Sequence, residues 1–588
     1  MIPQAIRQWF DRGARLKVFY DEAYRLPLSG VESGPRQLET RRADDVVHYL
    51  LAAEVVRPGD VLTPQPASYG ELGRVHADEY LESLQRPETL AQIFAVDVSD
   101  VYADELLRTI RLATGGSIAG ARHALEHRSP VLNLLGGFHH ALPMRGAGFC
   151  AVNDVAITVA ALRADGFLGR IAVLDLDAHP PDGTAACLGR DASVWLGSIS
   201  GTTWGPLEGV DEVHLPDGAS DDVYLGALDT LLARMPAVEF AIVLAGGDVL
   251  AGDRLGTLGL SLAGARRRDL RVFERFAELP QLWLPAGGYT SHAWKVLAGS
   301  ALVLARHSDE PIPSDFDPLA ARMKGIMRSL KPEALGNAPL LTEADVADAL
   351  GLPRSGPPRL LDFYTSEGLE FALEKYRVLP LLRRLGFEEL HVVIDRAGAY
   401  DRARLHGTDS TTRTKVVLVE LEVERRRVGS GTFLFVNWLS LRNPRAKFSA
   451  LRPQLPGQEV PGLGLAKEMS QLLALMATRL VLDGVAFRPS WFHMAWAARH
   501  DARFVDSRRQ GRFEALCRDL RNVPLLEATR AVAEGRVRLN GEPYGWEPDE
   551  MVRWLKPPDD EADREAIAAE RERCRFSLLG ATATSPRG

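Results

Sequence analysis

The chain has 588 residues, more than one hydrophobic core usually organises, so its length favours two or more domains. Hydrophobic residues make up 46% of it and charged residues 25%, a globular balance that excludes a wholly disordered chain. The formal net charge of −8 argues against a dedicated nucleic-acid-binding protein, because such proteins normally carry a basic excess. The four cysteines lie far apart without a CxxC pair, which excludes a disulfide framework and a zinc ribbon.

The sequence contains no long apolar segment. Charged residues interrupt the first twenty positions, so the apolar stretch of a signal peptide is missing there. No window approaches the roughly 18 uncharged apolar residues that a membrane-spanning helix needs. We therefore expect a soluble, cytoplasmic protein without a membrane partner.

Between about residues 130 and 305, short aliphatic runs alternate with amphipathic segments of helical length. This alternation predicts βαβ units that form an open, mostly parallel sheet with helices on both faces. The expected strands are Val131–Leu135, Arg170–Asp177, Ser193–Ser200, Phe240–Asp248 and Gln281–Tyr289. The expected helices are Asp44–Val55, Ala77–Leu84, Ala103–Glu126, Ala151–Ala164, Asp222–Met235 and Leu262–Leu279.

The sequence changes character between residues 310 and 360. Two proline-rich segments, DEPIPSDFDP (309–318) and GLPRSGPPR (351–359), lack hydrophobic periodicity and are typical of linkers. We predict a first domain at 1–310, a linker region at 311–359 and a second α/β or α+β domain at 360–588. Its expected elements are a helix at Glu367–Leu385, strands at Leu390–Ile394, Thr414–Glu424 and Thr432–Leu441, a helix from about Ala466 to Val481 and a charged helical tail at Asp559–Arg575.

Polar residues cluster where the expected strands of the first domain end. The five strand ends read GGFHH (136–140), DLDAH (175–179), GSIS (197–200), AGGD (245–248) and AGGY (286–289). In an open α/β sheet, ligands bind beyond the carboxyl ends of the strands, so these residues should converge on one edge. One polar residue at a strand end is usually a loop cap, but this many together favour a chemical function.

Three of these residues could hold a metal ion. Asp177 and His179 are two positions apart on an extended segment and can therefore point to the same side. Asp248, from another strand end, would complete a set of two oxygens and one nitrogen, which is typical of a catalytic zinc site with a position left for water. A simple Asp–His hydrogen bond would explain the first pair alone, but the adjacent His139 and His140 favour the metal.

A metal-bound water needs a neighbour that takes its proton, and either histidine could serve because imidazole titrates near neutral pH. Asp175 and Asp182 could each accept a hydrogen bond from one imidazole ring and so select its tautomer. Tyr289 could donate a hydrogen bond to the oxyanion of a tetrahedral intermediate.

These segments resemble the histone deacetylase family, the zinc-dependent acyl-lysine hydrolases with an arginase-like α/β fold, whose relatives include acetylpolyamine amidohydrolases. The resemblance covers about residues 15–305, with the motifs in the family's order and spacing. The matching pieces are VFYDEAY (18–24), RVHADEYLESL (74–84), GGFHHA (136–141), GFCAVND (148–154), DLDAH with DGTA (175–185), AGGDVLAGDRLGTLGLS (245–261) and PAGGY (285–289).

The resemblance implies a complete catalytic centre. The implied zinc ligands are Asp177, His179 and Asp248. The implied proton-transfer and oxyanion groups are His140 backed by Asp182, its electrostatic partner His139 backed by Asp175, and Tyr289. The implied structural potassium ligands are Asp175 and Ser198, with the backbone carbonyls of Asp177 and His179.

The resemblance also implies a narrow channel for the acylated lysine. Phe149 would form one wall, and the Gly148 carbonyl would hold the substrate amide. Two departures bear on substrate choice: two prolines follow His179 where many members have His-Gly, and Ser200 stands where many relatives have a histidine. Trp204 could form the second aromatic wall or could be ordinary packing.

The leading hypothesis is a zinc-dependent amidohydrolase that removes acetyl or another small acyl group from acylated protein lysine, without a direct nucleic-acid partner. The same chemistry on acetylpolyamines or another small-molecule amide is the first alternative, because the rim loops resemble the family least. A non-catalytic module that binds acyl-lysine is the second, although such a module should have lost a metal ligand or the tyrosine.

The second domain is not assigned to a family. Its order of helix, strands, glycine-rich loop and helix weakly resembles the acetyltransferase fold. PGLGLA (461–466) at a helix start could bind a pyrophosphate through backbone N–H groups, but a tight turn at a helix entry explains the same residues.

Overall fold

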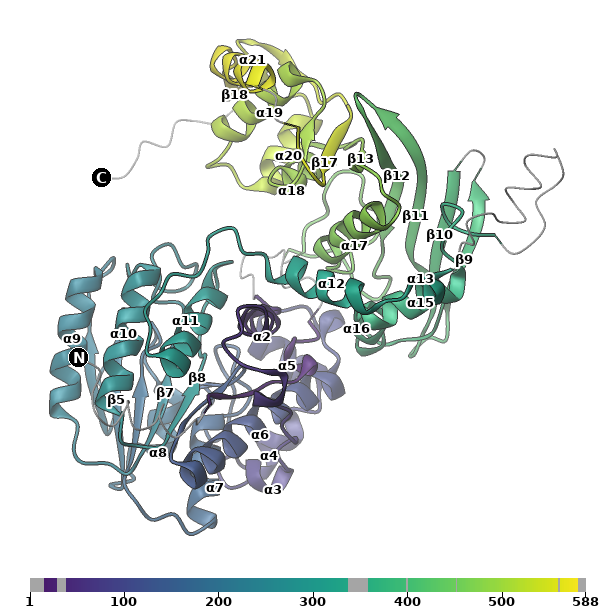
Figure 1. Ribbon diagram of the computed structural model, residues 1–588. Coiled ribbons are helices and arrows are strands. Elements are labelled where there is room, and N and C mark those ends of the chain that lie inside the picture. Colours follow the sequence, from purple (N-terminus) through teal and green to yellow (C-terminus); the bar gives the residue numbers. More distant parts are fainter. Residues whose placement is uncertain are drawn as a thin grey trace. The chain divides into compact units, whose positions relative to one another are not determined.

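The computed structural model describes residues 15–28, 39–336, 358–397, 400–450, 452–558 and 561–579. The chain divides into two compact units, Met1–Arg322 and Met323–Gly588, and each unit is described by itself (Figure 1). Within the predicted linker region, α12 (Pro318–Ser329) and α13 (Pro332–Leu335) are helical. The proline-rich segment at 351–357 lies outside the described residues.

The first unit is built on an eight-stranded sheet in which every neighbouring pair of strands is parallel. The strand order is β2-β1-β3-β8-β7-β4-β5-β6. The strands are β1 (Lys17–Phe19), β2 (Val61–Leu62), β3 (Pro130–Asn133), β4 (Ile171–Asp175), β5 (Val194–Ser200), β6 (Val210–His214), β7 (Phe240–Leu244) and β8 (Gln281–Leu284). The prediction of an open parallel α/β sheet is therefore confirmed.

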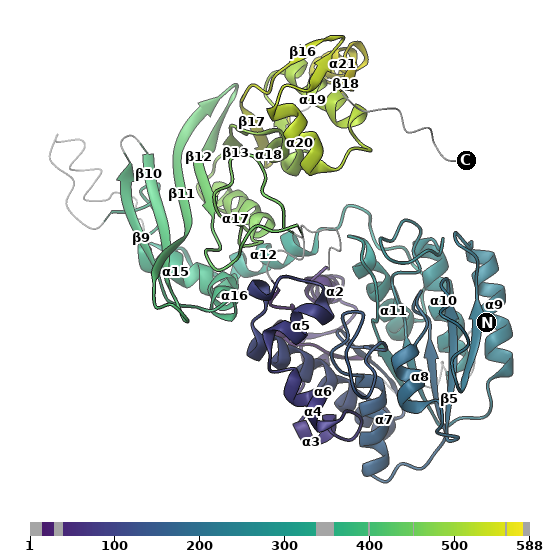
Figure 2. The ribbon, with the colours of Figure 1, turned by 180° about the vertical axis from the view of Figure 1, so that it is seen from behind.

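Helices cover both faces of this sheet (Figures 1 and 2). Successive residues of a strand point to opposite faces. In β4, Ala172 and Leu174 pack in a core shared with α2, α9, α10 and α11, whereas Ile171 and Val173 pack in a core shared with α6 and α7. Because both faces are buried, the central strands are continuously apolar, as is usual for parallel sheets.

All six helices expected in the first unit are present, with ends that differ by a few residues. The structure contains four further helices there. They are α2 (Arg42–Ala52), α3 (Tyr69–Leu72), α4 (Asp78–Ser83), α5 (Pro87–Phe94), α6 (Ala103–His127), α7 (Asp154–Ala164), α8 (Asp182–Leu188), α9 (Asp221–Arg234), α10 (Leu262–Arg275) and α11 (Ala293–Arg306). None of the helices in the described part of the chain is both long and apolar enough to cross a membrane.

The second unit contains a seven-stranded mixed sheet in the order β14-β17-β13-β12-β11-β10-β9. Its neighbours are antiparallel except for the parallel pair β12 and β13. The strands are β9 (Phe387–Ala397), β10 (Tyr400–Asp409), β11 (Lys415–Val428), β12 (Gly431–Leu441), β13 (Gly484–Phe487), β14 (Arg503–Phe504) and β17 (Met551–Trp554). A smaller sheet joins β15 (Val537–Leu539), β16 (Glu542–Tyr544) and β18 (Phe576–Leu578).

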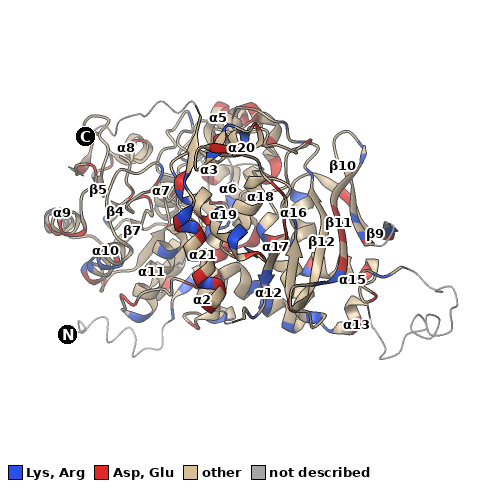
Figure 3. Ribbon diagram, turned by 90° about the horizontal axis from the view of Figure 1, so that it is seen from above, with Lys and Arg blue, Asp and Glu red and all other residues tan. Residues whose placement is uncertain are grey.

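The helices of the second unit are α15 (Ser366–Lys375), α16 (Val378–Arg384), α17 (Ala466–Arg479), α18 (Phe492–Ala498), α19 (Ser507–Asp519), α20 (Leu525–Ala533) and α21 (Glu561–Arg573). The single helix expected at Glu367–Leu385 is wrong, because the chain breaks at Arg377, whose φ is 65°. The new helix then places Pro380 in its first turn, where a missing N–H costs nothing. Charges of both signs are interspersed along α19 and α21 (Figure 3).

Candidate metal and catalytic site

The parallel sheet brings the predicted site residues to one edge. The loop after β3 carries His139 and His140, and the segment after β4 carries Asp177 and His179. The loops after β7 and β8 carry Asp248 and Tyr289. Three of the predicted strands were too long at their carboxyl ends. Strands β4, β7 and β8 end at residues 175, 244 and 284, and the loop residues beyond them form the candidate site.

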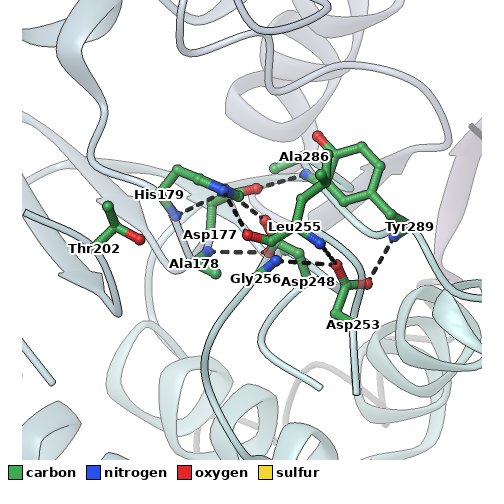
Figure 4. A network of polar contacts seen from close by, with 12 residues as sticks. Asp177, Ala178, His179, Thr202, Asp248, Asp253, Leu255, Gly256, Ala286 and Tyr289 are labelled. Carbon is green, nitrogen blue, oxygen red and sulfur yellow. Dashed lines mark hydrogen bonds and ion pairs between the residues drawn. The ribbon is translucent and has the colours of Figure 1, made fainter. Parts of the chain in front are cut away.

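Asp177, His179 and Asp248 form a compact set of possible metal ligands. One ligand atom from each lies within 4.8 Å of the others. The Nδ1 atom of His179 lies 3.1 Å from Asp177 Oδ1 and 3.0 Å from Asp248 Oδ2 (Figure 4). His179 Nε2 lies 3.2 Å from the Leu255 carbonyl oxygen and can donate to it, which leaves the Nδ1 lone pair for a metal. Two oxygens and one nitrogen in a buried setting fit zinc.

The charges at this triad also fit a cation. Burial and the nearby Asp177 raise the pKa of Asp248 to about 7. Burial opposes the charged form of His179, but its contacts with the two carboxylates outweigh burial and raise its pKa to about 11. A proton thus offsets the buried negative charge, and a metal ion at this position would replace that proton.

Backbone N–H groups hold the carboxylates in place. Gly287 N–H donates to Asp177 Oδ2 at 2.6 Å, and Ala178 N–H donates to Asp248 Oδ1 at 3.0 Å. A Cβ atom at Gly287 would lie 2.5 Å from Asp248 Oδ2 and 2.6 Å from Asp177 Oδ2. The loop after β8 therefore needs glycine at this position to approach the two carboxylates.

The two histidines each pair with the carboxylate expected from the sequence. His139 Nδ1 lies 2.8 Å from Asp175 Oδ2, and His140 Nδ1 lies 2.7 Å from Asp182 Oδ1. Burial opposes a charge on His139, but Asp175 and Asp177 raise its pKa to about 9. Burial and the charge of His139 lower the pKa of His140. Because the ring centroids are only 4.0 Å apart, two positive charges on the pair would repel each other. The favoured state therefore has a protonated His139 and a neutral His140.

Tyr289 lies on the same edge, with its ring centroid 5.7 Å from that of Phe149. Burial raises the pKa of Tyr289 well above its ordinary value, and the carboxylates of Asp177 and Asp248 raise it further. The phenol therefore stays protonated and can donate a hydrogen bond.

The predicted substrate-contacting residues surround the histidines. The Trp204 ring centroid is 5.3 Å from that of His140 and 6.4 Å from that of His179, and Trp204 is 52% exposed. Gly148 has a φ of 53°, and a Cβ atom there would lie 2.4 Å from His140 Cδ2. The Cys150 thiol donates to the Gly148 carbonyl at 3.3 Å, which leaves that oxygen a second lone pair.

The predicted potassium ligands Asp175 and Ser198 are opposite each other on β4 and β5. Both are 1% exposed, and the Ser198 hydroxyl finds no hydrogen-bond partner within the described ranges. A buried oxygen without a partner beside a buried carboxylate fits a bound cation.

Two residues of the site were missed by sequence reasoning. Arg42 of α2 donates from Nη1 to the Gly287 carbonyl and from Nη2 to the Ala286 carbonyl, each at 2.6 Å. Asp253 accepts from the Tyr289 N–H at 2.9 Å and from the Leu255 N–H at 3.0 Å (Figure 4). Asp253 lies inside the AGGDVLAGDRLG motif, which was its only signal; nothing in the sequence near Arg42 indicated its role.

Comparison with known proteins gives a family for the first unit. Residues 36–304 match the family model described as the histone deacetylase domain. Histone deacetylase 2 of Arabidopsis thaliana is 31% identical over 312 residues, which cover 50% of this chain and 79% of that protein. An uncharacterized protein of Picosynechococcus sp. is 32% identical over 257 residues, covering 42% of this chain and 85% of the relative.

Among solved structures, an HDAC homolog from Aquifex aeolicus aligns with a TM-score of 0.42 and 22% identity, covering 52% of this chain and 87% of that one. The family assignment depends on the sequence relatives and on the matched domain. Over residues 36–304 the chain belongs to the histone deacetylase family, whose members are deacetylase hydrolases.

Proposed function

We propose that the first unit is a zinc-dependent deacylase that hydrolyses the amide of acylated lysine in protein substrates. The observation that carries this proposal is the convergence of the Asp177, His179 and Asp248 ligand atoms within 4.8 Å, beside two carboxylate-paired histidines. If these three residues only stabilised the fold, the hydrogen bonds among them would be sufficient. A histidine pair and a buried phenol at the same edge of the sheet would then have no purpose.

Asp177, His179 and Asp248 would hold the zinc, and Asp175 with Ser198 would hold a structural potassium ion. When bound, zinc polarises the acyl carbonyl and makes water at the site more acidic. The protein groups around it then have to move protons and stabilise developing charge.

His140 would take the proton of the attacking water. Its Nδ1 is held by Asp182, so Nε2 is the atom that accepts this proton. The same Nε2 later gives the proton to the lysine nitrogen as the C–N bond breaks. Water and amide thereby become a carboxylic acid and an amine, with atoms and protons balanced. His139, held by Asp175, carries a positive charge that disfavours protonated His140, so His140 readily gives its proton up again.

Tyr289 would donate its phenolic hydrogen to the carbonyl oxygen as that oxygen becomes anionic. Phe149 and Trp204 would enclose the aliphatic part of the lysine, and the second lone pair of the Gly148 carbonyl would accept the substrate N–H. We further propose a cytoplasmic location, which cell fractionation would test.

The direct test strips the purified protein of metal and adds back zinc with an acetyl-lysine peptide and acetylated diamines. We expect turnover of the peptide only after zinc is added, and its loss in His140→Ala. His127→Ala, an exchange at a half-exposed histidine of α6, serves as the matched control and should keep full activity.

The same panel separates the alternatives. Turnover of the diamines alone would assign the small-molecule amide reaction. If the zinc-loaded protein bound the peptide saturably without turnover, the proposed enzymatic activity would be contradicted. The non-catalytic binding module would then be favoured.

A further inference from the structure

The second unit contains an apolar cavity of about 100 Å³. It lies between one face of the large sheet, formed there by β9, β10 and β11, and the helices α15 and α17. Aliphatic side chains make up nearly all of its wall; Leu405 and Leu421 represent the sheet, and Leu473 and Met476 represent α17. Protein interiors rarely leave voids much larger than a water molecule, so a cavity of this size needs an explanation.

Strand alternation explains why the wall is apolar and where the space comes from. On β10, Ala403 and Leu405 face the cavity, whereas Arg402 and Arg404 pair with Asp395 on the other face of the sheet. Ala403 is 8% exposed and contributes only a methyl group where a larger residue would fill the space. An engineered apolar cavity of about 150 Å³ takes benzene, so this one has room for roughly four to five carbon atoms.

Among the described residues, the wall of the cavity contains one charged side chain. Arg479, the last residue of α17, contributes to the wall, and its Nη2 donates to the carbonyls of Met327 and Leu330 at 3.2 and 3.3 Å. These bonds cap the end of α12 and use one nitrogen of the guanidinium. Within the described ranges, Arg479 forms no ion pair with a carboxylate.

Two tyrosines, Tyr364 and Tyr376, also line the cavity. Burial raises the pKa of Tyr364 and of Tyr376, and in both cases Arg479 opposes the rise while no carboxylate contributes. Both phenols therefore stay protonated and can donate hydrogen bonds. A cation without an acidic partner and two hydroxyl donors, all from residues in the wall of an apolar cavity, are complementary to a carboxylate with an aliphatic tail.

We propose that this cavity binds a short-chain aliphatic monocarboxylate, with its alkyl chain between the sheet and the helices α15 and α17 and its carboxylate at Arg479. The site belongs to the second unit alone and does not depend on the deacylase proposal.

Calorimetry on the full-length protein with pentanoate, acetate and pentan-1-ol tests the proposal. Each buried methylene contributes roughly fourfold in affinity, and pentanoate has three more than acetate, so it should bind about 60-fold more tightly. Pentan-1-ol fills the same space without the charge and should bind at least about tenfold more weakly than pentanoate. Absence of saturable pentanoate binding, or equal binding of the acid and the alcohol, would overturn the proposal in the wild-type protein itself.

Two variants locate the site. Arg479→Met should lower pentanoate affinity to that of pentan-1-ol and leave the alcohol unchanged, and Arg479→Lys should keep part of the preference for the acid. Arg383→Met, at a surface arginine paired with Glu374, is the matched control. If Arg479 were only a cap for α12, its loss would lower the unfolding temperature and affect both ligands alike, which would contradict the proposal.

Ala403→Leu should fill the cavity and abolish binding of both ligands. Ala566→Leu, the same exchange on the exposed side of α21, should change neither. Pentanoate binding that survives Ala403→Leu in the folded protein would place the carboxylate elsewhere and refute the assignment.

Discussion

At the scale of single residues, removing the hydroxyl of Tyr289 tests the proposed stabilisation of the transition state separately from metal binding. Tyr289→Phe keeps the ring beside Phe149 and all three proposed zinc ligands, so zinc content should not change. Loss of one oxyanion donor typically costs about 10²–10³ in rate, and an interaction made only in the transition state lowers kcat and kcat/KM together. We expect that loss in steady-state kinetics with KM nearly unchanged.

Two comparisons complete the Tyr289 test. Tyr69→Phe, at an exposed tyrosine, should have no effect on activity. Asp248→Ala should lose bound zinc, measured by metal analysis, together with activity. A Tyr289→Phe enzyme with normal kcat would mean that the tyrosine only packs.

A second residue-scale prediction concerns stability toward acid. Burial lowers the pKa of His48 on α2 from 6.5 to about 4, with the charge of Arg322 acting in the same direction. The unfolded chain therefore binds this proton at a higher pH than the folded chain does. The stability due to neutral His48 is present above about pH 6.5 and is lost as the pH falls toward 4.

The shift corresponds to about 3 kcal/mol in the free energy of unfolding. His48→Leu should remove this part of the acid sensitivity, measured by urea unfolding of metal-free protein at several pH values. The Leu168→Ala exchange, at an exposed residue that cannot titrate, should leave the pH dependence as it is. Identical pH profiles for wild type and His48→Leu would contradict the pKa assignment.

At the scale of elements, Asp253 couples the loops that follow β7 and β8. One carboxylate oxygen accepts from the Tyr289 N–H, and the other accepts from Leu255 and Gly256. Asp253→Ala should release Tyr289 and lower kcat about tenfold or more, with KM and zinc content little changed. Asp253→Asn keeps one acceptor and should recover part of kcat.

The control for Asp253 is Asp229→Ala, which removes a surface carboxylate paired with Arg271. A merely structural Asp253 would lower the unfolding temperature without changing kcat of the folded enzyme. That result would exclude a positioning role for this residue.

The elements themselves differ in how well the sequence predicts them. Strands β3, β4, β5, β7 and β8 were predicted because both of their faces are buried and their runs are continuously apolar. Strands β1, β2 and β6 were missed because β1 and β2 have only three and two residues and three of the five residues of β6 (VDEVH) are polar. In the second unit, β10 was missed because charged residues fill alternate positions on its outer face.

At the scale of the whole molecule, the catalytic unit should function without the second unit. The structure places the useful truncation point at Arg322, later than the predicted end of the first domain near residue 310. Phe316 packs against Tyr49 and Trp294, with ring centroids 5.1 and 6.4 Å away, so a chain ending at Ser314 would lose core contacts. A chain ending at Arg322 should keep most of the deacylase activity and zinc binding.

The measurement for this truncation is kcat/KM on an acetyl-lysine peptide, with circular dichroism to verify folding. The chain ending at Ser314 is the comparison and should unfold at a lower temperature. A folded 1–322 fragment without activity would show that the catalytic site requires the second unit.

The sequence by itself determined the fold class of the first unit and supplied the residues of the candidate site as a prediction. Both come from local sequence patterns. Apolar runs end in polar, glycine-rich motifs, and Asp177 and His179 are two positions apart in one of these motifs. The tertiary structure decided what no local pattern contains. It brought Arg42 to the Gly287 carbonyl across 245 positions, separated the pKa values of His139 and His140, and left the Ser198 hydroxyl without a partner in the described residues. These properties arise from burial and from contacts between distant segments, which exist only once the strands have assembled into one sheet.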